Sequence, residues 1–168
     1  MDSNLSLAVG FKGQLNLNAQ AVPMQEGYLK IGGIVDAGQT DGLKFGVVCS
    51  ADPTAPSQFK AGVVSGNVFR GIVVFDDAIA QNAPAHPDYY LPQTPCAAVL
   101  KGLVRFDSWT TTGTKAIEPV IGCKAEYNTT TGVIEFIASG SSADTGCAII
   151  DNASVVEVTG QGAFLYLA

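Results

Sequence analysis

Apolar and polar side chains alternate along the N-terminal stretch of this chain, from residue 5 to residue 21. Successive side chains of an extended strand point to opposite sides, so a period of two indicates a strand with one apolar face and not a helix. The larger residues of that face are Leu5, Leu7, Val9, Phe11, Leu15 and Leu17. The feature restricts this part of the chain to extended structure.

The length of this stretch leaves two interpretations open. At about 3.3 Å per residue it spans roughly 55 Å, whereas an ordinary strand spans about 17–20 Å. Either the chain folds back at Gly10 or Gly13 into two strands of one sheet, or it is an arm that lies along a neighbouring subunit. We therefore divide the chain into residues 1–22, an extended arm or first strands, and residues 23–168, a single β-rich domain.

Short strand-like runs separated by turn residues continue to the end of the chain. They cover residues 27–35, 43–49, 61–64, 68–75, 96–107, 120–127, 133–138, 154–159 and 163–167, and the run at 96–107 is broken by Gly102. Residues 128–132 read as a hairpin turn, residues 57–61 as a short helical turn, and the proline-rich residues 82–95 as irregular. The pattern predicts an all-β fold, a compact β-barrel or β-sandwich of about ten short strands with little helix.

The composition of the chain disfavours two classes of binding partner, nucleic acids and anionic membranes. The net charge is −6, and the nine lysines and arginines are scattered, so there is no basic footprint for nucleic acid or for an anionic membrane surface. Charged residues make up only 14% of the chain, against about 25% in typical soluble domains, which suggests a surface partly covered by identical neighbours. No secretory signal pattern is visible, so we expect synthesis in a cytoplasm.

The residues needed for catalysis are sparse. The single histidine, His86, lies in a proline loop without a local partner, and the neighbouring Asp76 and Asp77 point to opposite faces if they extend a strand. The four cysteines lack the close spacing of a metal or redox pair. We expect no enzyme and no catalytic, metal-binding or cofactor-binding residue. Enzymatic use of His86 and the two aspartates is the least favoured alternative.

The last run of the chain, AFLYLA, is apolar on both faces. Leu165 and Leu167 lie on one face of such a strand, and Phe164 and Tyr166 lie on the other. A strand of this kind is buried on both sides, either centrally or under a partner. We expect Phe164 and Tyr166 at an oligomer contact, with Asp76 and Asp77 supplying charges at its rim.

The order of the motifs in the C-terminal hundred residues resembles that of the capsid decoration, or cement, proteins of tailed bacteriophages. In order, the motifs are VFRGIVVFDDAI, DYYLPQTP, AAVLKGLVRF with its central glycine, IGCKAEYNTTTGVIEF and GAFLYLA. In that family a segment like G-V-A-V-x-D precedes a strand with a central glycine, and a V-x-Y-x-x-x-T-G hairpin and an A-x-V-x-L strand follow. This chain departs in the bulkier residues 72–75 and in a longer proline-bearing loop after them.

The resemblance implies a structural virion protein that binds the outer surface of an expanded phage head. Its partners would be the major capsid protein and copies of itself, as trimers between capsomers, with assembly in the host cytoplasm. Two alternatives remain. One is a tail, head-fibre or baseplate β-module. The other is a soluble glycan-binding module with Trp109, Tyr89 and Tyr90 as its platform.

Overall fold

The computed structural model describes residues 19–21, 28–76, 79 and 88–168. Strands account for 50% of the structure and helix for 1%, which confirms the all-β prediction. The strands are β1 (Ala19–Ala21), β2 (Leu29–Val35), β3 (Leu43–Lys44), β4 (Val48–Ala51), β5 (Gln58–Ala61), β6 (Val68–Val73), β7 (Tyr89–Tyr90), β8 (Pro95–Phe106), β9 (Lys124–Asn128), β10 (Ile134–Ile137), β11 (Cys147–Ile149), β12 (Ala153–Thr159) and β13 (Gly162–Leu167).

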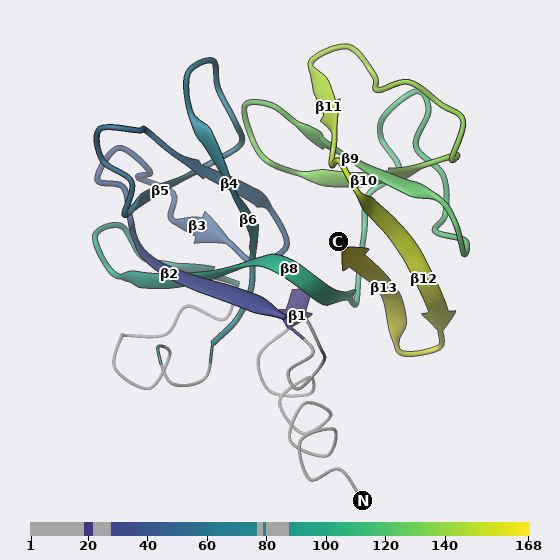
Figure 1. The fold of residues 1–168 in the computed structure, drawn as a ribbon, viewed down its shortest axis with the longest axis horizontal. Helices are drawn as coiled ribbons and strands as arrows, with labels where there is room; N and C mark the ends of the chain where they lie inside the picture. Colours follow the sequence, from purple (N-terminus) through teal and green to yellow (C-terminus); the bar gives the residue numbers. More distant parts are fainter. Residues whose placement is uncertain (1–18, 22–27, 77–78, 80–87) are drawn as a thin grey trace, which may run out of the picture.

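Five of these strands close into a barrel, seen on the left of Figure 1. Around the ring, β8 pairs with β2, β2 with β5, β5 with β4, β4 with β6, and β6 again with β8. All of these pairs are antiparallel except β2 and β5. The interior is filled by buried side chains that include Val35, Phe59 and Cys96. Closure removes free sheet edges from the barrel.

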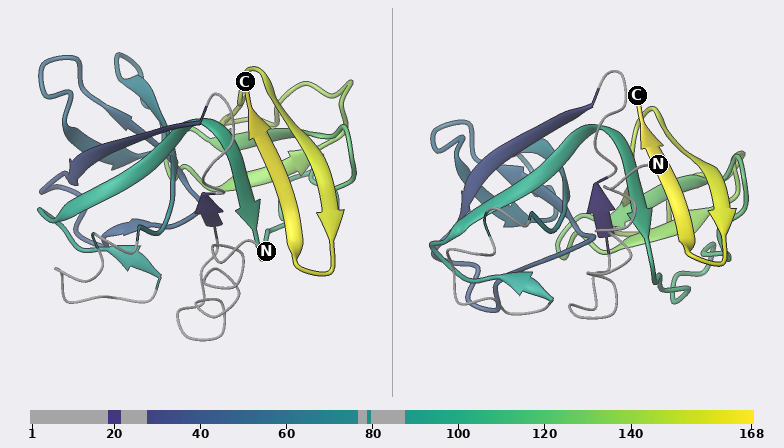
Figure 2. Two further views of the ribbon diagram at one scale, coloured as in Figure 1. Left: turned by 60° about the horizontal axis from the view of Figure 1, so that its bottom comes forward. Right: turned by 90° about the horizontal axis from the view of Figure 1, so that it is seen from below.

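Strand β8 connects the barrel to the rest of the molecule. Its first half belongs to the barrel, and its second half pairs with β13, which in turn pairs with β12 (Figures 1 and 2). The predicted break at Gly102 is wrong, because β8 runs through this residue without interruption. Gly102 has a φ of 120°, which residues with a side chain rarely adopt, and a Cβ there would lie 2.9 Å from the ring of Tyr28.

A second core lies between the outer face of the barrel, the β12–β13–β8 sheet and the three-stranded sheet β10–β9–β11. The predicted hairpin at residues 128–132 is confirmed as the connection between β9 and β10. Its turn also docks on the barrel, because the N–H of Val48 donates to the carbonyl of Gly132 at 2.8 Å. The N–H of Val63 donates to the carbonyl of Thr129 at 2.9 Å. Backbone contacts therefore hold this hairpin against β4 and the chain after β5.

Three local expectations are corrected. The run at 43–49 is divided by a turn, in which Gly46 has a φ of 81°, into β3 and β4. Residues 58–61 form strand β5 where a helical turn was expected, because they complete the barrel beside β2 and β4. The proline-rich stretch contains the two-residue strand β7, which pairs with β3.

Candidate interaction surfaces

The end of the predicted N-terminal arm is a strand on β8. Ala19 lies opposite Phe106 and Ala21 opposite Val104, and β13 pairs with the same part of β8, so β1 occupies the other edge. Phe106 and Val104 belong to the second core. The predicted contact residues Leu5, Leu7, Val9, Phe11, Leu15 and Leu17 lie outside the described residues.

The two faces of β13 differ as the sequence pattern indicated. Leu165 and Leu167 are buried in the second core, whereas Phe164 and Tyr166 are only partly buried on the opposite face. On that face Phe164 lies across from Arg105 of β8, and Tyr166 from Leu103. The two aromatic residues thus lie together and remain accessible for a contact with another subunit.

Asp76 already has partners within the chain. Its carboxylate forms an ion pair with Lys30 of β2, and its backbone N–H donates to the Tyr90 hydroxyl at 3.0 Å. Its side chain is 10% exposed. These contacts tie the end of β6 to β2 and to β7. Asp77, the other predicted rim charge, lies outside the described residues.

Two further carboxylates hold the loops beside the β10–β9–β11 sheet. Oε1 of Glu135 accepts hydrogen bonds from Thr112, through its N–H at 2.7 Å and its hydroxyl at 2.8 Å, and from the N–H of Gly113 at 3.0 Å. Burial raises the pKa of Glu135, but these hydrogen bonds outweigh burial and leave the pKa below its usual value. The Asp144 carboxylate accepts hydrogen bonds from the Thr114 hydroxyl at 2.6 Å and from the Lys115 N–H at 3.0 Å.

Glu126 lies directly opposite Glu135 across β9 and β10 and is fully buried. Its Oε2 accepts the backbone N–H of Asp144 at 2.8 Å. Within the described part of the chain, no group of three or more His, Cys, Asp or Glu residues is arranged to hold a metal ion. The carboxylates of this region act as anchors for loops.

The predicted aromatic platform is not assembled. Tyr90 is buried in the barrel core, where its hydroxyl donates to the Val74 carbonyl at 2.7 Å. Trp109 packs on Phe136 at the second core, with ring centroids 6.3 Å apart, and its indole N–H donates to Glu118 at 2.7 Å. These two residues therefore belong to different cores. His86 lies outside the described residues.

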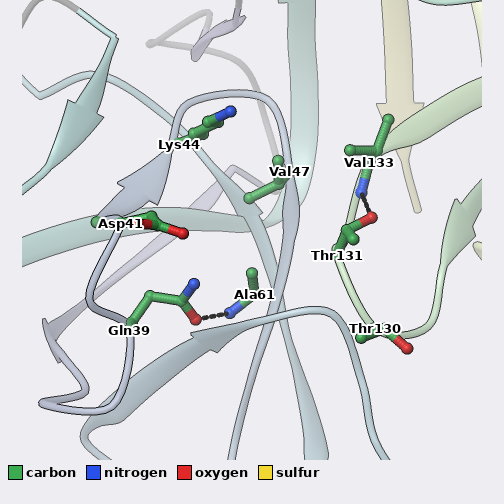
Figure 3. Close-up of a pocket in the computed structure, with 9 residues that line it drawn as sticks. Gln39, Asp41, Lys44, Val47, Ala61, Thr130, Thr131 and Val133 are labelled. Carbon is green, nitrogen blue, oxygen red and sulfur yellow. Dashed lines mark hydrogen bonds between the residues drawn. The ribbon is translucent and has the colours of Figure 1, made fainter.

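A hollow of about 320 Å³ lies between the barrel and the β9–β10 turn (Figure 3). Its lining consists of Gln39, Asp41, Gly42, Lys44, Val47, Ala61, Thr130, Thr131 and Val133. The Gln39 amide oxygen accepts the N–H of Ala61 at 3.1 Å, which fixes one wall. None of these lining residues is aromatic, so the hollow provides no ring on which a sugar could stack.

The sequence reasoning missed an exposed apolar cluster at the edge strand β12, here called the β12 patch and defined as Val120, Ile121, Val156 and Val158. Ile121 is 71% exposed, Val120 55%, Val156 45% and Val158 38%. The turn that carries Val120 and Ile121 lies beside β12, because the Gly122 N–H donates to the Val155 carbonyl at 2.8 Å. Gly122 was the available signal, since glycine is one of the residues that most often mark turns. Exposed apolar clusters mark interaction sites.

In the described ranges no helix has the length and apolarity that crossing a bilayer requires. A scan against protein-family models and a search of curated proteins find no match to this chain.

Proposed function

We propose that this chain is a structural virion protein that decorates the outer surface of an expanded phage capsid. It binds the major capsid protein and stabilises the shell, as homotrimers between capsomers. The observation that supports the proposal is β1, in which the last residues of the alternating segment add an antiparallel strand to β8 of the same chain. Strand addition supplies backbone hydrogen bonds, and alternate side chains supply specificity.

Charge and chemistry support a structural role. A net charge of −6 disfavours the DNA-facing interior of a head. Asp76, Glu135 and Asp144 act within the fold as partners of Lys30 and of loop N–H and hydroxyl groups. The partly exposed Phe164 and Tyr166 offer an apolar face to a neighbouring copy.

The other candidates have less support. A tail, head-fibre or baseplate module has the same chemistry and differs in copy number and location. A glycan-binding module is disfavoured, because Trp109 and Tyr90 lie in separate cores and the lining of the hollow contains no aromatic ring.

Deletion of residues 1–13 tests the proposal. We expect the truncated chain to fold and to lose binding to expanded heads that lack the protein, measured by co-sedimentation. Each apolar arm residue that becomes buried contributes about 1.5–3 kcal/mol before the cost of ordering the arm. Leu7→Ser should weaken binding, whereas the matched change Ala8→Ser on the polar face should not. Normal decoration by the truncated chain would exclude the arm mechanism.

A further inference from the structure

Two loops lie against the β10–β9–β11 sheet and are held there by carboxylates (Figure 1). One is residues 110–115, here called the cover, which belong to the connection between β8 and β9. The other is residues 138–146, the connection between β10 and β11. Glu135 of β10 accepts hydrogen bonds from two backbone N–H groups and two hydroxyl groups of the cover. Asp144 of the second loop accepts one bond of each kind from the cover.

Glu126 of β9 adds a third carboxylate to this cluster. Glu126 and Glu135 alternate with residues of the second core, so their side chains lie on the sheet face away from that core. Oε2 of Glu126 accepts the Asp144 N–H at 2.8 Å, whereas its Oε1 has no hydrogen-bond partner within the residues that the structure describes. Glu126 is fully buried. A buried carboxylate oxygen without a partner costs free energy that hydration recovers, so Glu126 opposes the closed arrangement of the loops.

The charges on this face of the sheet are predominantly negative. The titratable and charged side chains come from each packed element and are Glu126 and Lys124 of β9, Glu135 of β10, Cys147 of β11, Asp144 of the second loop and Lys115 of the cover. The Lys115 ammonium donates to the Ser142 and Ala143 carbonyls, at 3.0 and 3.1 Å. It therefore joins the cover to the second loop.

The closed cover and the ionised carboxylates stabilise each other. Burial raises the pKa of Glu135, but hydrogen bonds from the cover outweigh burial and leave the pKa below its usual 4.5. Hydrogen bonds from Thr114 and Lys115 lower the pKa of Asp144 from its usual 3.8. The stabilisation of the closed cover is therefore complete above these usual values, and it is lost as pH falls through the folded pKa values.

We propose that the cover is an acid-sensitive lid on the β10–β9–β11 sheet, which opens locally when Glu135 and Asp144 take up protons while the barrel stays folded. Protonation weakens both carboxylates as acceptors, and hydration of Glu126 then favours the open state. The hinge lies where the chain joins β10, because the Ile117 N–H donates to the Phe136 carbonyl at 2.8 Å. Opening uncovers Ile137, which is fully buried on the same face as Glu135. This inference is independent of the proposed function.

Amide hydrogen exchange of the full chain, followed by NMR over a series of pH values and corrected for intrinsic rates, tests the inference. Protection should fall by about tenfold per pH unit for each proton taken up on opening. This loss should be confined to the amides that donate to the three carboxylates, which are Thr112, Gly113, Lys115 and Asp144. The Val48 N–H, which donates to Gly132, should keep its protection over the same range.

Glu135→Gln removes one of the two titrating groups and should make the loss of protection shallower by about tenfold per pH unit. Asp144→Asn carries the same expectation, so the test stands if one of these two variants does not fold. The matched control is Asp52→Asn, because Asp52 also has a lowered pKa, from its hydrogen bonds to Thr54, but lies in the turn between β4 and β5. This control should leave the exchange of the cover unchanged.

Two results would overturn the inference. One is that the cover amides lose protection only together with Val48, at the pH where far-UV circular dichroism reports unfolding of the whole chain. The other is that Glu135→Gln and Asp52→Asn have equal effects on the pH dependence of the cover amides. Neither result bears on binding to phage heads, so the proposed function is tested separately.

Discussion

Replacing Gly132 by alanine should detach the β9–β10 turn from the barrel. Gly132 has a φ of 73°, a left-handed conformation that costs a residue with a Cβ about 1–2 kcal/mol. An added Cβ would lie 2.3 Å from the Val48 carbonyl oxygen and 2.7 Å from the Gly62 nitrogen, so the turn must move away. That movement weakens two backbone hydrogen bonds, worth about 0.5–1.5 kcal/mol each. The expected loss of unfolding free energy is about 2–5 kcal/mol.

Gly146→Ala is the matched control. Its φ is 78°, and an added Cβ meets no heavy atom within 4 Å in the described residues, so only the conformational cost of about 1–2 kcal/mol applies. Urea unfolding followed by the fluorescence of Trp109, the single tryptophan, measures both variants. At about 2–4 °C per kcal/mol, their thermal midpoints should also differ by several degrees. Equal losses in the two variants would refute the close docking of the turn.

Three further predictions concern titration and burial. The pKa of Glu135 in the folded chain is lower than its usual value of 4.5, so the ionised carboxylate stabilises the fold at pH values above 4.5. This stability is lost as the pH falls through the folded pKa, and Glu135→Gln should therefore flatten the acid side of the profile of stability against pH. Tyr90→Phe removes the buried hydrogen bond to Val74 and should cost about 1–3 kcal/mol in urea unfolding. A thiol reagent should modify only the partly exposed Cys147 of the native chain and all four cysteines after denaturation, because Cys49, Cys96 and Cys123 are buried.

Local patterning predicted the elements whose partners are near in sequence. Period-two alternation and flanking glycines located β12 and β13, and the asparagine-to-glycine turn at 128–132 located the β9–β10 hairpin. Such pairings depend on turn chemistry and on which face is apolar, and both are visible in a single segment.

Features that depend on distant partners were not predictable in this way. The parallel pairing of β2 with β5 closes the barrel, yet neither segment encodes the identity of its neighbour. Gly102 looked like a break in the strand, yet β8 continues through it from its pairs with β2 to its pairs with β13. Val120 and Ile121 were assigned to a strand because they are apolar, whereas they lie exposed on a turn. Periodicity indicates which face of a strand or helix is apolar, but it does not identify the residues that cover that face.

The copy number of this protein in purified virions tests the central claim most directly. Quantitative mass spectrometry against the major capsid protein supplies the ratio. The proposed decoration of the shell predicts a value near one copy per shell subunit. A handful of copies would place the protein in the tail or at a vertex, and its complete absence would contradict a virion role.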